Sequence, residues 1–409
     1  MQKKGVMFPL LDGILQSIIE IDEKRSSLDD VLDNPHLIMA EMRRTASHWL
    51  FSFFRYRICV EEYIRKFANN GRIKKNLFRF AAASVVHCAF QNHVAREKMV
   101  NVFVEYAKIK YGFSEGRFIN ALLRKVCREN PEFKAVLPEW CSRHWRKIFG
   151  SEFVKTAEKC LGCEPVDVFR LRQGFEIDGF EYEILPCDLQ KFTFFQTSEI
   201  DKCIESGCFQ HGGIYIQDAA TGFAVELLDK YLPQKQGSFI DVCGAPGGKS
   251  IMFHDLRPDW QITVGDLSCK RHKRTAENLQ RCKINAVLEC FDASTFEFKK
   301  QYDAVFADVP CSNSGVFRKR PDVLYRFDEK SLHEVVEIQK KILDNIASAV
   351  ADNGFLLYST CSIEPAEDGG QIRNFCLRHI EFELLEERLT LPDVMHDGSY
   401  CAVLRRNAK

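Results

Sequence analysis

Long apolar runs are missing from this sequence. None of its apolar stretches reaches the ~18 residues that a transmembrane helix needs, so we expect no membrane partner. The first residues, Met1 to Asp22, also lack a secretory signal, because Asp12 interrupts their apolar stretch and no small-residue cleavage site follows. Of the 409 residues, 45% are hydrophobic and 28% are charged, and no repeat or low-complexity segment occurs. These proportions are typical of a soluble globular protein, and we expect a cytoplasmic monomer.

The 17 cysteines lack the regular spacing of a disulfide framework. Because they occur in a long chain without a secretory signal, we expect reduced thiols, most of them buried and a few of them catalytic. One cysteine pair has the spacing of zinc ligands and three cysteines follow it, but no second Cys-x-x-Cys and no histidine pair completes a set. Zinc therefore stays a weaker alternative, and we expect no metal. The cysteines in question are Cys160, Cys163, Cys187, Cys203 and Cys208.

A net charge of zero hides an asymmetry along the chain. Residues 1–150 hold 26 Lys+Arg against 16 Asp+Glu, a net charge of +10, and the remainder holds 31 against 41, a net charge of −10. A basic module joined to an acidic one indicates that the first module helps to hold a polyanion. A solvated helical surface would give the same charge count, so both interpretations stay open on charge alone.

Hydrophobic periodicity divides the chain into three parts. From about residue 5 to 150, apolar residues recur at three- and four-residue spacing, which predicts helices. Residues 175–185 alternate around Asp178-Gly179, which predicts a hairpin. From about residue 216, predicted strands alternate with helical stretches, and the clearest strands are 238–242, 261–266, 302–308 and 354–359.

This order of elements predicts the fold. Strands that alternate with helices are typical of an open, mostly parallel α/β sheet with helices on both faces, a Rossmann-like arrangement. We therefore expect an all-α domain at 1–150, a linker or small α+β subdomain at 151–215, and an α/β domain at 216–409.

A glycine-rich loop follows the first strand of the α/β domain. It reads Asp-Val-Cys-Gly-Ala-Pro-Gly-Gly-Lys-Ser over 241–250 and continues into a predicted helix, whose N-terminus offers free N–H groups to a ligand. The glycine spacing excludes a P-loop and also the Gly-x-Gly-x-x-Gly fingerprint of dinucleotide enzymes. The loop therefore indicates a nucleoside cofactor other than ATP or NAD.

Acidic residues end the next strands. Asp266 follows the second strand, where a carboxylate can accept hydrogen bonds from ribose hydroxyls, and Asp292 is placed to contact an adenine edge. Asp308 ends a further strand. A single Asp at the end of a strand is more often a helix cap. Four strands that each end in or near an acidic residue, with Asp241 of the glycine-rich loop as the first, instead predict a nucleoside-binding crevice.

Two cysteines occupy equivalent places at the carboxyl ends of strands. Cys311 lies in Asp308-Val-Pro-Cys-Ser-Asn-Ser-Gly-Val316, and Cys361 lies in Ser359-Thr-Cys-Ser-Ile363. An isolated cysteine is most often a buried structural thiol. Two cysteines beside a cofactor loop instead indicate thiol chemistry.

These motifs together resemble the Nol/Nop/Sun family of RNA cytosine-5 methyltransferases, and most closely its bacterial Sun/Fmu type, which acts on small-subunit (16S) ribosomal RNA. Residues 118–125 are similar to the last helices of the NusB-like RNA-binding domain found in that type. The chain departs from the family at Val309, Asn313 and Asp368, where alanine, glycine and asparagine are usual. The motifs that carry the resemblance are 217–221, 243–250, 308–322, and 359–363 with Glu367-Asp368.

The resemblance implies an S-adenosyl-L-methionine-dependent enzyme that binds RNA, with 16S rRNA as the expected partner. It implies that Cys361 adds to carbon-6 of cytosine, that Cys311 assists release, and that Asp308 holds the base. Arg318, Lys319 and Arg320 are candidate phosphate contacts, although a solvated basic turn is an equal alternative. The residues implied to hold the cofactor are Cys243, Gly244, Ala245, Pro246, Gly247, Gly248, Lys249, Asp266, Asp292 and Asp308.

Two other functions remain alternatives. A non-catalytic RNA-binding or ribosome-assembly factor on a methyltransferase fold would share the overall pattern, but the intact cysteines, Asp308 and the glycine loop argue against a decayed site. An NAD-dependent enzyme is disfavoured by the loop spacing.

Overall fold

The computed structural model describes residues 2–69, 71–90 and 96–408. The chain divides into two compact units, Met1–Glu164 with Phe317–Asp328, and Pro165–Val316 with Glu329–Lys409. The first unit thus runs beyond the expected boundary at 150 and includes a segment from much later in the chain. Within the described ranges, no helix is both long and apolar enough to cross a bilayer.

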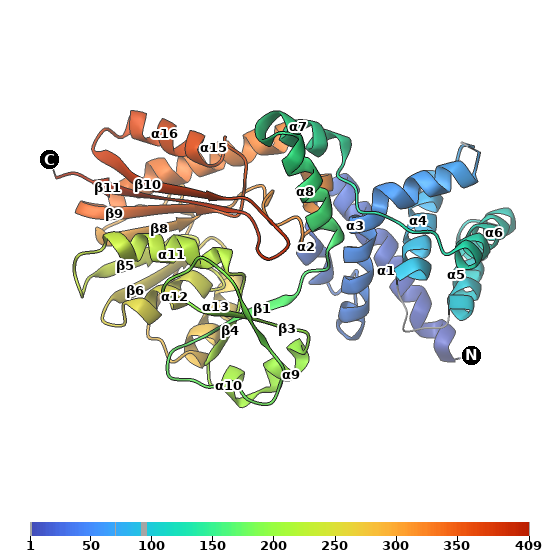
Figure 1. Cartoon of the computed structure of the whole chain (residues 1–409), viewed down its shortest axis with the longest axis horizontal. Helices are drawn as coiled ribbons and strands as arrows, with labels where there is room; N and C mark the ends of the chain where they lie inside the picture. The colour runs from blue at the N-terminus through green and yellow to red at the C-terminus, as the bar shows by residue number, and fades with distance from the viewer. Residues whose placement is uncertain (1, 70, 91–95, 409) are drawn as a thin grey trace. The chain divides into compact units, whose positions relative to one another are not determined.

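The first unit is helical, as its periodicity predicts (Figure 1). Its core gathers aromatic side chains, and the buried Trp49 donates its indole N–H to the carbonyl of Ala83 at 2.8 Å. The helices are α1 (Gln2–Lys24), α2 (Leu28–Leu32), η1 (Ala40–Met42), α3 (Arg43–Phe67), α4 (Lys75–Phe90), α5 (Arg96–Lys110), α6 (Phe113–Glu129), α7 (Glu139–Phe149), α8 (Ser151–Gly162) and α14 (Val323–Arg326).

Residues 317–328 belong to the core of this helical unit. Tyr325 packs against Phe54 with ring centroids 5.6 Å apart, and Arg55 donates to the carbonyl of Arg318 at 2.9 Å. The Arg318 side chain is 1% exposed. Its predicted phosphate contact is therefore wrong, because burial in this core keeps the guanidinium from a phosphate. Arg320 forms an ion pair with Asp29.

The second unit begins with a small antiparallel sheet, ordered β2-β3-β1-β4. The hairpin expected at 175–185 is wrong: its second half, β2, pairs with β3 instead, and Phe175 and Phe180 pack onto the core of this sheet. The elements are β1 (Asp167–Leu171), β2 (Glu183–Leu185), β3 (Phe194–Thr197), β4 (Ile214–Ile216), α9 (Ile200–Glu205) and α10 (Gly207–Gln210).

A seven-stranded sheet follows, ordered β10-β11-β9-β8-β5-β6-β7. The five strands from β9 to β7 are parallel to their neighbours, and β11 and β10 add an antiparallel edge. The predicted Rossmann-like sheet is confirmed. Its elements are α11 (Ala220–Tyr231), β5 (Ser238–Asp241), α12 (Gly248–Leu256), β6 (Gln261–Asp266), α13 (Cys269–Arg281), β7 (Val287–Cys290), β8 (Tyr302–Asp308), α15 (Glu329–Ile346), η2 (Ala347–Ala349), β9 (Val350–Thr360), α16 (Gly369–Arg378), β10 (Phe382–Thr390) and β11 (Ser399–Arg406).

Strand order defines where a ligand binds. The chain runs from β5 outward through β6 and β7, and then returns to place β8 on the other side of β5. Such a reversal opens a crevice at the carboxyl ends of the two central strands. The loops after β5 and β8 meet at this crevice.

A buried ion pair fastens the small sheet to α12, the helix that begins in the glycine-rich loop. Arg170 on β1 is 1% exposed and donates to Asp255 at 2.6 Å, and Arg172 donates to the other oxygen of the same carboxylate at 2.7 Å. Burial lowers the pKa of Arg170, and Asp255 opposes that shift. The pair attaches β1, which is itself paired with β4, to the last turn of α12.

We predict that Asp255→Ala lowers the free energy of unfolding by about 3–5 kcal/mol, because it leaves the buried Arg170 charge without its counter-ion. Chemical denaturation of the full chain measures the change. Asp259→Ala, at an exposed neighbouring position, is the matched control and should stay within ~0.5 kcal/mol of wild type. Equal effects of both substitutions would contradict the assignment.

Candidate active site

The glycine-rich loop turns tightly over the end of β5. A Cβ added at Gly244 would lie 2.7 Å from Asp241 Cγ and 2.6 Å from Val264 Cγ1, so only glycine fits there. Asp241 is buried and accepts a hydrogen bond from Ser250 Oγ at 2.8 Å. Burial, with a contribution from the charge of Asp308, raises the pKa of Asp241 to about 7. This packing brings the backbone of the loop to the crevice.

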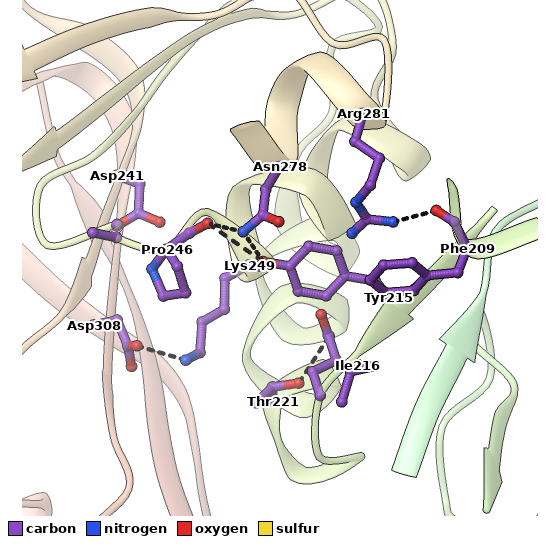
Figure 2. A pocket seen from close by; sticks show the side chains of 14 residues that line it. Phe209, Tyr215, Ile216, Thr221, Asp241, Pro246, Lys249, Asn278, Arg281 and Asp308 are labelled. Atoms are coloured by element: carbon purple, nitrogen blue, oxygen red, sulfur yellow. Dashed lines mark hydrogen bonds and ion pairs between the residues drawn. The ribbon is translucent and has the colours of Figure 1, made fainter. Parts of the chain in front are cut away.

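Lys249 and Asp308 form an ion pair across the crevice. Lys249 Nζ lies 2.5 Å from Asp308 Oδ2 (Figure 2). Ser359 Oγ donates to the other carboxylate oxygen at 2.6 Å. Burial lowers the pKa of Lys249, but the charge and hydrogen bond of Asp308, together with Cys361 and Asp241, outweigh burial and the net pKa is raised. Cys361 contributes to this raised pKa, so the thiol lies within electrostatic reach of the ammonium group.

The two predicted cysteines lie in contact. Cys311 Sγ and Cys361 Sγ are 3.2 Å apart, and Cys361 Sγ donates to Asn313 Oδ1 at 2.9 Å. The hydrogen bond with Cys361, together with burial, raises the pKa of the Cys311 thiol well above its usual value. Asn313 has a φ of +60°, a left-handed conformation that glycine and asparagine adopt most readily. The departure at Asn313 therefore preserves the backbone and adds an acceptor for the Cys361 thiol.

Glu367 joins the loops that carry the two cysteines. Its carboxylate accepts hydrogen bonds from the backbone N–H of Ser312 at 2.8 Å, from Ser362 Oγ at 2.7 Å and from Gln339 Nε2 at 2.8 Å. Burial raises the pKa of Glu367. One carboxylate thus fixes the residue after each cysteine.

The predicted ribose and adenine residues lie on the next two loops. Asp266 is buried and accepts from the backbone N–H of Ala245 at 3.2 Å, which ties it to the glycine-rich loop. Asp292 is exposed, and hydrogen bonds from Ser294 lower its pKa. Its carboxylate is therefore open to solvent beyond the end of β7.

A disulfide links these two loops. Cys269 at the start of α13 is bonded to Cys290 at the end of β7. The expectation of reduced thiols is therefore wrong for this pair, because the parallel pairing of β6 with β7 brings together two residues that are 21 positions apart. In the described part of the chain, no group of three or more His, Cys, Asp or Glu is arranged to hold a metal.

A cavity of about 310 Å³ opens beside the glycine-rich loop (Figure 2). Six of the twelve predicted site residues line it. The other six lie outside its lining and are Cys243, Gly247, Asp266, Asp292, Cys311 and Cys361. The complete lining consists of Phe209, Tyr215, Ile216, Gln217, Thr221, Asp241, Gly244, Ala245, Pro246, Gly248, Lys249, Asn278, Arg281 and Asp308.

Some residues of the site carried no prediction of a role. Glu367 and Ser359 lie in motifs that the sequence singles out, but nothing in the pattern indicates that they hydrogen-bond across loops. Gln339 lies in the middle of α15 and is buried, and it gives no sequence signal at all. Gln217 Oε1 is buried at the cavity without a hydrogen-bond partner in the described structure.

The seven-stranded sheet, with its loop and crevice, gives the second unit a Rossmann-like α/β fold. Residues 229–403 match the family model "16S rRNA methyltransferase RsmB/F", and residues 7–128 match the "NusB family" model. Two successive parts of the chain are therefore similar to these two families.

Curated relatives agree with these domains. Proteins from Yersinia pestis and Yersinia pseudotuberculosis named "Ribosomal RNA small subunit methyltransferase B" are 35% identical to this chain over 185 residues. That match covers 44% of this chain and 42% of the relatives' own length.

Solved structures share the fold. PH0851 has a TM-score of 0.73 at 20% identity and covers 97% of each chain. NSun6 from Pyrococcus horikoshii has a TM-score of 0.57 at 17% identity, covering 66% of this chain and 99% of its own. A methyltransferase homolog from the same organism has a TM-score of 0.55 at 23% identity, covering 69% and 98%.

Asp368, the last departure from the family pattern, is explained by its protonation. Its carboxyl group accepts from Thr360 Oγ1 at 2.7 Å, and Oδ2 has no hydrogen-bond partner in the described structure. Burial raises the pKa of Asp368 well above its usual value. A neutral carboxylic acid has nearly the shape of the asparagine side chain that is usual here.

We predict that Asp368→Asn stabilises the protein increasingly as the pH rises. The folded state of wild type keeps a proton that the unfolded chain releases above a pH of about 4, so wild type loses stability toward neutral pH and asparagine does not. We expect the difference in unfolding free energy to grow from pH 5 to pH 8, by up to about 1.4 kcal/mol per pH unit while the folded state keeps its proton. Asp259→Asn is the control, and a difference that is independent of pH would contradict the assignment.

Proposed function

We propose that this protein is an S-adenosyl-L-methionine-dependent RNA cytosine-5 methyltransferase that acts on small-subunit 16S ribosomal RNA. The observation that carries the proposal is the pair of thiols, 3.2 Å apart, with Cys361 within electrostatic reach of the Lys249–Asp308 ion pair. The two domain matches and the names of the Yersinia relatives support an rRNA substrate. A cytoplasmic location follows from that substrate, and the expected monomer remains a prediction.

The residues at the crevice fit the cofactor. The backbone of the glycine-rich loop and the start of α12 present N–H groups, and a Cβ at Gly248 would lie 3.1 Å from the Tyr215 ring, so the close approach requires glycine. Asp266 and Asp292 offer carboxylates for ribose hydroxyls and an adenine amine, and Lys249 with 243–248 would hold the methionine part. When bound, S-adenosyl-L-methionine supplies an electrophilic methyl group.

Cys361 activates the target base. Carbon-5 of cytosine is a poor nucleophile until a thiolate adds to carbon-6 and makes the ring an enamine, which splits one difficult step into easier ones. The ammonium of Lys249 places a positive charge within electrostatic reach of this thiol, and the thiolate is the nucleophilic form of cysteine. Asp308 would hold the ring at N3 and its exocyclic amine, where charge develops during addition. The base must leave the helical stack to reach these groups.

Cys311 serves the release step. After methylation, carbon-5 must lose its proton so that the Cys361–carbon-6 bond breaks and the ring recovers its aromatic form. Cys311 contacts the nucleophile and therefore reaches the same pair of carbons. To take this proton Cys311 must act as the thiolate, and its raised pKa makes that thiolate a strong base.

We predict that Cys361→Ala reduces turnover by about 10⁴-fold or more, because the covalent step is lost. Stabilisation of the protein by S-adenosylhomocysteine should persist, and NAD should give none. Tritium transfer from labelled S-adenosyl-L-methionine to 16S rRNA measures turnover. Cys376→Ala, a half-buried free cysteine on α16, is the control. Substantial activity of the Cys361 variant would refute the proposed nucleophile, whereas a wild type without turnover would favour a non-catalytic RNA-binding factor.

We predict that Cys311→Ala accumulates a covalent protein–RNA adduct, because addition and methylation proceed while release fails. The adduct should survive a denaturing gel and depend on S-adenosyl-L-methionine. The double variant Cys311→Ala/Cys361→Ala should form none. An adduct that forms equally well without Cys361 would overturn the division of roles between the two cysteines.

A further inference from the structure

Helix α13 carries a concentration of positive charge within the acidic part of the chain. Although residues 151–409 have a net charge of −10, this helix of 13 residues contains five basic residues and one acidic residue. The basic residues are Lys270, Arg271, Lys273, Arg274 and Arg281, and the acidic residue is Glu277.

Four of these cations lie on one face of the helix. Lys273, Arg274 and Arg281 follow Lys270 by three, four and eleven positions, spacings that bring each of them to the same side of an α-helix as Lys270. The first three are exposed, and none of them pairs with a carboxylate in the described structure. Arg271 points elsewhere and pairs with Asp266 at 2.8 Å. The four cations on one face are called the α13 stripe below.

The stripe ends at the cavity of the active site. Arg281 lines that cavity together with Lys249 and Asp308, so the last cation of the stripe faces the same space as the catalytic ion pair (Figure 2). Asn278, one turn earlier, also lines the cavity and donates to the carbonyl of Pro246 at 2.9 Å. The stripe is therefore continuous with the crevice.

Arg281 is held in position by neutral groups only. Its Nη1 donates to the carbonyls of Phe209 at 2.8 Å and Ile214 at 2.9 Å, and the guanidinium lies 4.2 Å from the centroid of the Phe209 ring. No carboxylate pairs with Arg281 among the residues that the structure describes. Its remaining N–H groups form a fork of the kind that binds phosphate in two-point contacts.

We propose that the α13 stripe binds the RNA backbone and that Arg281 holds the phosphate of a nucleotide next to the target cytosine. This inference rests on the proposed function, because it requires RNA in the crevice. A cytosine bound at Asp308 brings the phosphates of its own and the adjoining nucleotide with it, because they are joined through the sugar. Arg281 is a cation fixed in the same cavity, where it can meet one of these phosphates. The exposed lysines and arginine extend the contact outward as phosphate neutralisers without sequence selectivity.

The test measures RNA affinity against salt concentration, independently of activity. Filter binding of transcribed 16S rRNA to the full chain, over about 50 to 400 mM KCl, gives a log–log slope that counts neutralised phosphates. The variants are Arg281→Gln and Lys273→Gln/Arg274→Gln. The matched control, Lys235→Gln/Lys299→Gln, removes two exposed lysines near the amino ends of β5 and β8, away from the crevice.

We expect the slope to fall by about one for Arg281→Gln and by about one to two for the double variant, with the control unchanged. The affinity for S-adenosylhomocysteine should stay at the wild-type value in all variants. Slopes equal to wild type would overturn the proposal. It would also be overturned if Arg281→Gln weakened S-adenosylhomocysteine and left RNA unchanged, since the anion would then be the cofactor's carboxylate. If only the proposed methylation were wrong, the wild-type protein would still bind RNA with this salt dependence but would not methylate it. The two failures can therefore be distinguished.

Discussion

The hydrogen bonds of Glu367 hold the reactive part of this molecule together. The two thiols come from loops about 50 residues apart in sequence, and each loop alone could move relative to the other. Because one buried carboxylate receives the N–H of Ser312 and the hydroxyl of Ser362, the positions of both loops are set by a single group. Gln339 supplies the third donor and fixes the carboxylate against α15.

Protonation differs sharply among groups only a few ångströms apart. Raised pKa values keep protons on Asp241, near pH 7, and on Cys311, whereas Lys249 holds its proton through Asp308. The crevice thus contains one fixed cation within electrostatic reach of the Cys361 thiol, and acids that burial favours in their neutral form. Neighbouring groups with such different protonation states are typical of sites that transfer protons.

Much of this arrangement could be predicted from the sequence, because parallel strands bring their carboxyl ends to one edge. That rule alone gathers the glycine-rich loop, Asp308 and both cysteines. It could not foresee the Cys269–Cys290 bond, the buried position of Arg318 or the role of Gln339. Each depends on contacts between residues distant in the chain, for which local patterns hold no information. The hairpin expected around Asp178-Gly179 failed for the same reason, since its aromatic residues prefer the core of the small sheet.

The segment 317–328 has a consequence for biosynthesis. Phe317 packs on Trp145 and Tyr325 on Phe54, so the amino-terminal helices lack part of their core until these residues are present. A ribosome must therefore translate past β8 of the seven-stranded sheet before the first helices can reach their final packing. The amino-terminal unit, although made first, finishes folding only after residue 328 has left the exit tunnel.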